Sequence, residues 1–190
     1  MKIISAKFIK TVVGEDAILQ DKTPQVAFIG RSNVGKSSTI NALVKQKGLA
    51  IVSALPGRTQ GVNVFLINEA FYLIDLPGYG YAKLSKTDRA WLHDLINWYL
   101  FNKKFEQKKI ALIIDANVGP TKDDLELLHE LEDQNKNILV IANKIDKIKK
   151  SEYFKQCNKI KELIGYHEII FYSSKTGIGI PEIINKIFGD

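Results

Sequence analysis

The chain has 190 residues, of which 45% are hydrophobic and 25% are charged, and its formal net charge is +6 at pH 7. This size and composition fit one domain with a substantial core, and no apolar stretch approaches the length of a membrane span. The one cysteine, Cys157, excludes an internal disulfide, so we expect a cytoplasmic protein. Because no stretch is long and apolar enough to span a membrane, we expect no membrane partner. The positive charge fits either a polyanionic partner such as RNA or lysine used for solubility, and charge alone does not decide between them.

The first part of the chain predicts an edge strand, a buried strand and a helix. β-forming residues among lysines indicate that residues 1–24 form a strand-like arm, which ends in a turn over 21–24. The apolar run Gln25–Ile29 predicts the first buried strand, and a helix is expected over 36–45. Residues 48–61 carry three glycines and a proline without periodicity, which predicts a functional or disordered loop.

The rest of the chain alternates strands and helices. Two strands, Val62–Ile67 and Phe71–Ile74, are separated by a short segment that fits a hairpin. A second loop leads to a helix over 88–103, on which Trp91 and Trp98 share one face and favour either core packing or a base-stacking platform. Further strands are expected over 110–115, 137–142 and 169–172, with further helices starting at Thr121, spanning 150–164 and starting at Ile180.

This alternation predicts an α/β fold with helices on both faces of a mostly parallel sheet. We expect six strands in the sheet, one of them antiparallel. In such sheets the ligand lies beyond the C-terminal ends of the strands. Each of the motifs described next lies at such an end, so the sequence predicts a single binding site.

The segment Gly30–Ser37 matches Gly-x4-Gly-Lys-Ser, the phosphate-binding P-loop. Gly30 and Gly35 allow the backbone to bring its N–H groups onto phosphate oxygens, at the N-terminus of the following helix. Lys36 would reach the β- and γ-phosphates, and the Ser37 hydroxyl would ligate Mg²⁺. The residues expected to bind the phosphates are Gly30, Arg31, Ser32, Asn33, Val34, Gly35, Lys36, Ser37 and Ser38.

An acidic residue ends the second hairpin strand, in the order Asp75-Leu76-Pro77-Gly78. Aspartate and glycine are common in turns, so the pattern is weak alone, but it follows the P-loop by about forty residues and resembles a Walker B arrangement. We expect this segment to line the phosphate site, with Asp75 holding Mg²⁺ through a coordinated water.

The motif Asn143-Lys144-Ile145-Asp146 predicts which base is bound. The Asp146 carboxylate would accept from N1–H and the exocyclic amine of guanine, whereas adenine would leave it unpaired. The stem of Lys144 would lie over the base and ribose, and the Ser174 N–H would meet guanine O6. Ser173 and Lys175 would shape that last loop.

Together these motifs make the chain similar to a small GTPase-type G domain from Gln25 to the end, and more closely it resembles the EngB-type GTPases (the YihA/YsxC group) of the TrmE–Era–EngA–EngB–septin class. The stretches that carry this resemblance are Gly30–Ser37, Pro56-Gly57-Arg58-Thr59-Gln60 and Asp75-Leu76-Pro77-Gly78-Tyr79-Gly80-Tyr81-Ala82. It implies a single P-loop G domain over residues 1–190 that binds GTP and GDP and hydrolyses GTP with Mg²⁺. It also implies a role in large ribosomal subunit assembly and in cell division and septation, with the large ribosomal subunit or its rRNA as partner. We expect a monomer.

The resemblance also implies roles for individual residues. Lys36 would stabilise charge on the β–γ bridge, Thr59 would ligate Mg²⁺ together with Ser37, and Gly78 would donate its N–H to the γ-phosphate. Loss of that phosphate would release Thr59 and Gly78, which makes the protein a switch. The first switch loop would contribute Gly57, Arg58, Thr59, Gln60 and Gly61 to the nucleotide site.

Two residues bear on the rate of hydrolysis. Tyr79 stands where Ras-type proteins have a water-orienting glutamine, which predicts slow intrinsic hydrolysis. Asn33 stands where some relatives hold K⁺, which suggests stimulation by that cation. The alternatives are a metabolic nucleotide kinase and a septin-like or membrane-associated GTPase. The motif at 143–146 argues against the first, and nothing resembling a basic amphipathic helix or coiled coil supports the second.

Overall fold

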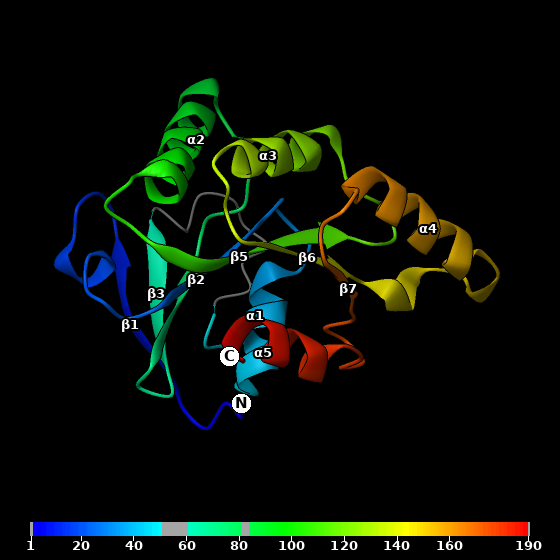
Figure 1. Cartoon of the computed structure of the whole chain (residues 1–190), viewed down its shortest axis with the longest axis horizontal. Coiled ribbons are helices and arrows are strands. Elements are labelled where there is room, and N and C mark those ends of the chain that lie inside the picture. Colours follow the sequence, from blue (N-terminus) through cyan, green and yellow to red (C-terminus); the bar gives the residue numbers. More distant parts are fainter. Residues whose placement is uncertain (1, 51–60, 81–83, 190) are drawn as a thin grey trace.

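The computed structural model describes residues 2–50, 61–80 and 84–189, and a twisted sheet forms its centre (Figure 1). Within these residues the sheet has seven strands in the order β1-β3-β4-β2-β5-β6-β7. The strands are β1 (Ala6–Val12), β2 (Gln25–Gly30), β3 (Val62–Ile67), β4 (Phe71–Asp75), β5 (Gln107–Asp115), β6 (Ile138–Asn143) and β7 (Ile169–Phe171).

The predicted α/β class is confirmed, with one correction to the number of strands. β2, β4, β5, β6 and β7 pair in parallel, and β3 runs antiparallel to both of its neighbours. The sheet gains a seventh strand because part of the N-terminal arm pairs with the whole of β3, from Ala6 opposite Ile67 to Val12 opposite Val62. Phe8 also packs edge-on against Phe65 across the two strands, with ring centroids 5.5 Å apart.

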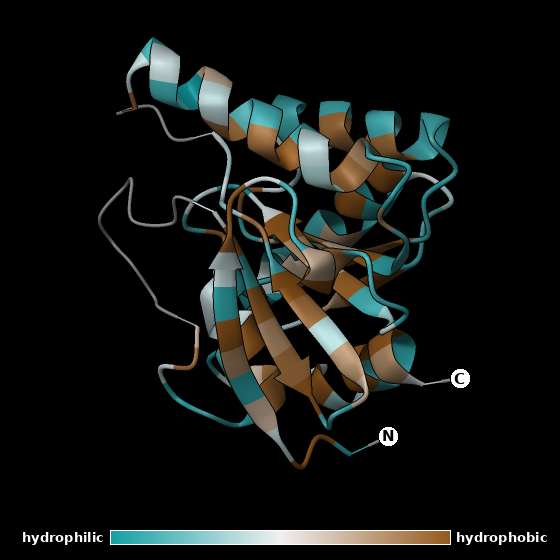
Figure 2. Ribbon diagram, turned by 90° about the vertical axis from the view of Figure 1, so that its left-hand side faces the viewer, coloured by the Kyte–Doolittle hydropathy of each residue, from teal (hydrophilic) through white to brown (hydrophobic). Residues whose placement is uncertain are grey.

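Helices cover both faces of the sheet, as predicted. α1 (Lys36–Val44) and α5 (Ile180–Phe188) lie on one face, and α2 (Lys86–Phe101), α3 (Lys122–Asp133) and α4 (Tyr153–Ile164) lie on the other (Figure 1). Successive side chains of a strand point to opposite faces, so β2 places Val26 and Phe28 under α1 and places Ala27 and Ile29 under α2. Figure 2 shows the result, a sheet of mostly hydrophobic strands between helices that turn their hydrophilic side outward.

The two tryptophans of α2 differ in their surroundings. Trp98 packs edge-on against Phe105 with ring centroids 5.0 Å apart, as part of the core, whereas Trp91 is 41% exposed. Core packing is therefore confirmed for Trp98 and not for Trp91. No helix in the described ranges is long and apolar enough to cross a membrane.

Helix boundaries follow local capping. α2 begins two residues earlier than predicted, because the Ser85 hydroxyl accepts from the Asp88 N–H at 3.0 Å. α3 begins after Thr121, as its sequence indicates, in a capping box with Asp124. A 3₁₀ turn over Lys150–Glu152 precedes α4, so the α-helix itself begins only at Tyr153.

Candidate nucleotide-binding site

The P-loop connects β2 to α1 through two glycines that no other residue could replace without strain. A Cβ on Gly30 would lie 2.3 Å from the Ile113 carbonyl oxygen. Gly35 has φ of +96° and precedes the first residue of α1, and a Cβ there would lie 2.4 Å from Asn143 Nδ2. The backbone therefore curls tightly at the N-terminus of α1, the arrangement that suits a bound phosphate.

Lys36 joins the P-loop to the end of β4. Its ammonium forms an ion pair with the Asp75 carboxylate, and both side chains are almost entirely buried. The two motifs are 39 residues apart in the chain, so this contact brings the predicted Walker B aspartate to the first turn of α1. A hydroxyl from Ser37 and a carboxylate from Asp75 are oxygen ligands of the kind that Mg²⁺ prefers, so these residues fit the predicted metal.

The segment after Asp75 runs along the P-loop. The Ser32 N–H donates to the Tyr79 carbonyl at 2.8 Å, and the Ser32 hydroxyl donates to the Gly78 carbonyl at 3.3 Å. A Cβ on Gly78 would lie 3.1 Å from the Ser32 nitrogen, a tight contact that would require the P-loop to shift by a few tenths of an ångström. These contacts keep Gly78 beside the loop that would hold the phosphates.

Asn143, at the end of β6, connects three parts of the site from a fully buried position. Its amide donates to the Val34 carbonyl at 2.9 Å, and its oxygen accepts from the N–H groups of Lys144 at 2.7 Å and Ser174 at 3.0 Å. The Ser174 N–H, which we expected at guanine O6, thus points to Asn143 in this structure. Asn143 supports the site by joining its loops.

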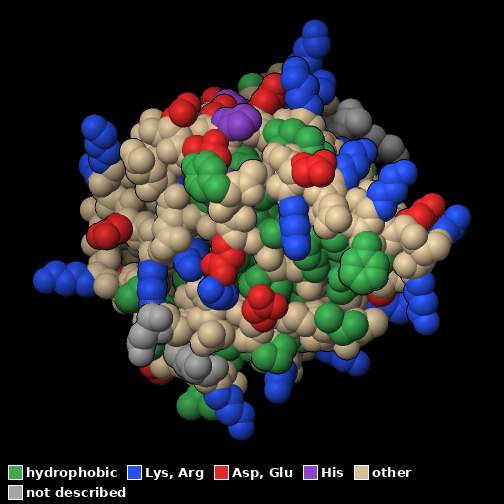
Figure 3. Space-filling model, turned by 45° about the vertical axis from the view of Figure 1, so that its right-hand side comes forward, with side chains coloured by type: hydrophobic (Ala, Val, Ile, Leu, Met, Phe, Trp, Pro, Cys, Tyr) green, Lys and Arg blue, Asp and Glu red, His purple; other side chains and the backbone are tan. Residues whose placement is uncertain are grey.

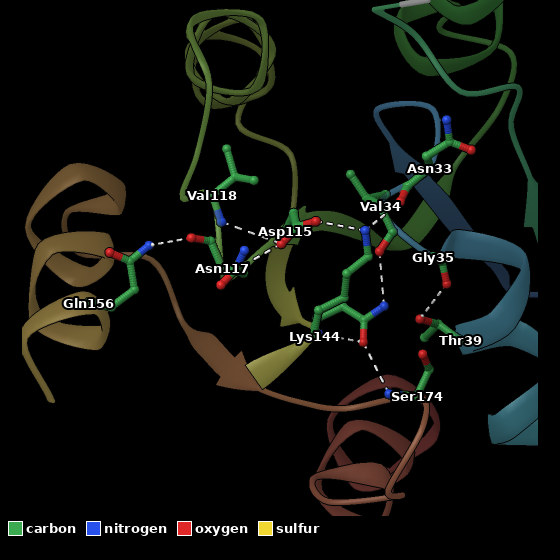
Figure 4. Close-up of polar contacts among 11 residues, drawn as sticks. Asn33, Val34, Gly35, Thr39, Asp115, Asn117, Val118, Lys144, Gln156 and Ser174 are labelled. Carbon is green, nitrogen blue, oxygen red and sulfur yellow. Dashed lines mark hydrogen bonds and ion pairs between the residues drawn. The ribbon is translucent and has the colours of Figure 1, made fainter. Parts of the chain in front are cut away.

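Lys144 has φ of +69° and reaches back across the site. Its ammonium donates to the Asn33 carbonyl at 2.6 Å and pairs with the Asp115 carboxylate at 2.6 Å (Figure 4). Two acceptors on different elements therefore fix the stem that we expect to cover the base.

Asp115 is a site residue that the sequence analysis missed. It ends β5, and the register of the parallel strands sets it beside Asn143. One carboxylate oxygen accepts from the Asn117 N–H at 3.0 Å while the other faces Lys144. Asp115 ends an apolar strand as Asp75 does, but no motif in the sequence shows that the strand register sets it beside Asn143.

Asp146 is held by the last loop. The Ser173 hydroxyl donates to its carboxylate at 2.6 Å and itself accepts from the Thr176 N–H at 3.1 Å. Ser173 is fully buried whereas Asp146 is exposed, so a rigid loop orients an accessible carboxylate. Lys175, next in the same loop, is exposed.

A hydrophobic pocket of about 490 Å³ lies beside Asp146. Among the residues lining it, Phe154 is 80% exposed and Ile178 is 58% exposed. This apolar surface is therefore open to solvent next to the carboxylate that we expect to bind the base.

Tyr79 points away from the P-loop. Its hydroxyl donates to the Asp124 carboxylate at 2.6 Å. Burial, followed by the charge of Asp124, raises the pKa of the Tyr79 phenol well above its ordinary value of 10, so the group stays protonated and acts as a donor.

Four predicted nucleotide-binding residues of the first loop, Gly57, Arg58, Thr59 and Gln60, lie outside the described residues, as do Tyr81 and Ala82. The residues on either side of 51–60 make specific contacts with the rest of the fold. Ala50 exchanges two hydrogen bonds of 2.8 Å with the Asn41 side chain. Gly61 lies against β1, where a Cβ would come within 2.6 Å of the Val12 carbonyl oxygen.

The chain matches known GTPases by sequence and by structure. A family model described as 50S ribosome-binding GTPase matches residues 25–144, and a model of the elongation factor Tu GTP-binding domain matches residues 108–189. A probable GTP-binding protein EngB from Clostridium perfringens (strain 13 / Type A) is 42% identical, over 100% of this chain and 98% of the relative. One from Acholeplasma laidlawii is also 42% identical and covers both chains fully.

Two solved structures resemble the fold. A crystal structure of a probable GTP-binding protein EngB matches with a TM-score of 0.72 and 26% identity, over 86% of this chain and 96% of that chain. Era in complex with MgGDPNP and nucleotides 1506–1542 of 16S ribosomal RNA matches with a TM-score of 0.66 and 27% identity, over 86% of this chain and 55% of that chain. The matches extend over the P-loop, the Asp75 segment and Asn143, and the chain belongs to the EngB family of GTP-binding proteins.

Proposed function

We propose that the protein is a cytoplasmic, Mg²⁺-dependent GTP switch that acts in large ribosomal subunit assembly and is needed for normal cell division. The observation that supports a switch best is the ion pair between Lys36 and Asp75, which joins the phosphate loop to the Asp-x-x-Gly segment. The ribosomal role is supported by the matching family description, 50S ribosome-binding GTPase.

GTP would bind with its phosphates at the N-terminus of α1 and its base at Asp146. Lys36 would exchange Asp75 for the β- and γ-phosphate oxygens, and Gly78 would donate its N–H to the γ-phosphate. Ser37, Thr59 and, through a water, Asp75 would hold Mg²⁺, which supplies positive charge against the phosphates. Hydrolysis then depends on positioning and charge neutralisation, because little covalent chemistry is left for the protein.

Intrinsic hydrolysis would be slow and cation-dependent. The Tyr79 hydroxyl is engaged by Asp124, so it does not orient a water molecule. The Asn33 side chain is exposed beside the P-loop, where it could help to hold K⁺ (Figure 4). Turnover measured in KCl and in NaCl at equal ionic strength tests this, and equal rates would remove the role of K⁺.

The partner surface would lie beside the guanine motif. Lys150 lines the pocket, and the exposed lysines at 147, 149 and 155 are its close neighbours in the sequence. Figure 3 shows the molecule turned so that its right-hand side in Figure 1 comes forward, with basic side chains projecting around the rim and hydrophobic and acidic side chains exposed between them. Lysines attract RNA phosphates, and an exposed aromatic ring offers a base a stacking surface.

Co-sedimentation with large ribosomal subunits tests the proposal, with GDP and a non-hydrolysable GTP analogue compared at two salt concentrations. Binding favoured by the analogue and weakened by salt is expected. A variant with glutamate at 147, 149 and 150 should bind on the order of tenfold more weakly or worse. The matched control places glutamate at Lys7, Lys22 and Lys47, which are exposed elsewhere. Equal loss in both variants would reject this surface, and no binding by the wild type would reject the ribosomal partner.

A further inference from the structure

The residue after the Asp-x-x-Gly segment is anchored on helix α3. Tyr79 donates its hydroxyl to Asp124 at 2.6 Å, and its carbonyl accepts from the Ser32 N–H at 2.8 Å. Arg31 and Tyr79 also form a parallel β-bridge. Side chain and backbone of one residue thus connect the P-loop to α3.

Asp124 is a rigid acceptor. It is only 2% exposed, and its second carboxylate oxygen accepts from the Thr121 N–H at 2.8 Å and from the Thr121 hydroxyl at 2.7 Å. The carboxylate is therefore fixed by the capping box that begins α3. A hydrogen bond to a buried and immobile carboxylate is stronger than one between neutral groups.

The chain beyond Tyr79 is closely confined as well. Gly80 has φ of +69°, and a Cβ there would lie 2.9 Å from Arg31 Nε and 3.2 Å from Asp123 Oδ2. Side chains of the P-loop and of α3 thus both lie close to the backbone of Gly80, the residue after Tyr79.

We propose that Tyr79 and Asp124 are positioning residues that hold Gly78 ready for the γ-phosphate, and so set the ratio between the affinities of the protein for GTP and for GDP. The inference rests on the GTP switch proposed above. Gly78 directly precedes Tyr79, and its carbonyl already contacts the Ser32 hydroxyl. Only GTP offers Gly78 a phosphate oxygen, so the cost of ordering a loosened segment falls on GTP binding and not on GDP binding.

The test compares the affinities of GDP and a non-hydrolysable GTP analogue in the full chain with Mg²⁺. Tyr79→Phe removes the hydroxyl alone and should weaken binding of the analogue by roughly tenfold, with GDP changed by less than about twofold. The matched control is Tyr72→Phe, which also removes a Tyr–Asp hydrogen bond, the one of 2.9 Å to Asp21. Tyr72 lies near the start of β4, whereas Asp75 and the segment beside the P-loop lie at its end. That variant should keep the wild-type ratio of affinities.

A double-mutant cycle separates the anchor from the helix cap. Asp124→Ala should lower the ratio as Tyr79→Phe does, and the double variant should lose no more than either single change. Thr121→Ala weakens the cap of α3 but keeps the Tyr79 acceptor and the backbone N–H that holds Asp124, so it should lower the thermal midpoint and change the ratio of affinities by less than Tyr79→Phe does.

The outcomes are distinct. An unchanged or increased ratio in Tyr79→Phe, or an equal loss for both nucleotides, would overturn the inference while the GTP switch stands. A wild-type protein that binds neither nucleotide would overturn the proposed switch and this inference with it.

Discussion

At the scale of single residues, the site is built from side chains that hold one another. Lys144 is fixed between Asn33 and Asp115, and Asp146 is fixed by Ser173. Each contact joins residues from different loops, so a change in a supporting residue should alter nucleotide binding in a specific way.

Asp115→Asn should weaken GDP and GTP equally, because both carry the base that Lys144 covers. An amide can keep the acceptor for the Asn117 N–H while removing the charge that faces Lys144. We expect a loss of roughly tenfold, as for a charged hydrogen bond that is partly exposed. Fluorescent-nucleotide titration measures it. Asp133→Asn, an exposed change at the end of α3, is the control, and an equal effect in both variants would contradict the assigned role.

Asp146→Asn should change the base that is bound. The amide offers a donor where guanine presents its amine, and xanthine has a carbonyl at that position. GDP affinity should fall by at least about a hundredfold while xanthosine diphosphate gains, because a buried mismatch leaves polar groups unpaired. Competition between GDP and xanthosine diphosphate measures this change of base specificity. A variant that still prefers GDP would show that Asp146 does not read the base.

Residues within motifs could be picked out from the sequence because each motif is a short stretch of defined spacing. Lys36 and Asp75 are examples, and their ion pair places both motifs together. Asp115 and Asp124 could not be found this way. The first depends on the strand register beside Asn143, and the second lies 45 residues from Tyr79 and meets it only when α3 packs on the sheet.

At the scale of elements, the hairpin between β3 and β4 also secures the N-terminal arm. Asn68 and Glu69 both have positive φ, near +50°, and the Ala70 N–H donates to the Ile67 carbonyl at 3.0 Å, which closes a tight turn between the strands. The Asn68 side chain accepts from the N–H groups of Ile4 at 2.8 Å and Ser5 at 3.0 Å, and it donates to the Lys2 carbonyl at 2.8 Å. One turn residue thus ties the start of β1 to the sheet.

Asn68→Ala should lower the free energy of unfolding by about 1–3 kcal/mol, since three hydrogen bonds are lost and alanine fits positive φ poorly. Glu69→Ala changes the neighbouring residue, also at positive φ, without removing any of these hydrogen bonds, and glutamate bears the same backbone strain as alanine, so this matched control should cost less than about 0.5 kcal/mol. Urea unfolding of both variants measures the difference. Equal costs would mean that the arm is not held through Asn68.

Strand and helix order followed from the alternating apolar pattern, and most boundaries lie within three residues of those predicted. The arm was recognised as strand-like but was not counted in the sheet. Its pairing with β3 depends on a free sheet edge that the local sequence does not reveal. The arm adds few large apolar side chains to the fold: Phe8 packs against Phe65, and Val12 is buried in the core.

At the scale of the whole molecule, stability and nucleotide binding meet at the buried pair of Lys36 and Asp75. Asp75→Asn leaves a buried ammonium without its counter-charge, so the nucleotide-free protein should lose about 3 kcal/mol of stability. Added GDP and Mg²⁺ should raise the thermal midpoint of the wild type, and EDTA should reduce that gain.

Thermal unfolding with GDP, Mg²⁺ and EDTA measures both effects. The gain from Mg²⁺ should be largely absent in Asp75→Asn. Asp94→Asn, an exposed change on α2, is the control and should behave as the wild type does. A metal-dependent gain of normal size in Asp75→Asn would contradict the proposed role of this carboxylate.

The described residues on either side of 51–60 are both held by specific contacts. Ala50, on one side, forms two hydrogen bonds with the Asn41 side chain, and Gly61, on the other side, packs closely against β1. Ordering a segment of chain for a ligand costs less entropy when the residues at its two ends are already fixed. We therefore expect changes in Asn41 or in the N-terminal arm to alter the response of the protein to GTP, although neither belongs to a nucleotide-binding motif.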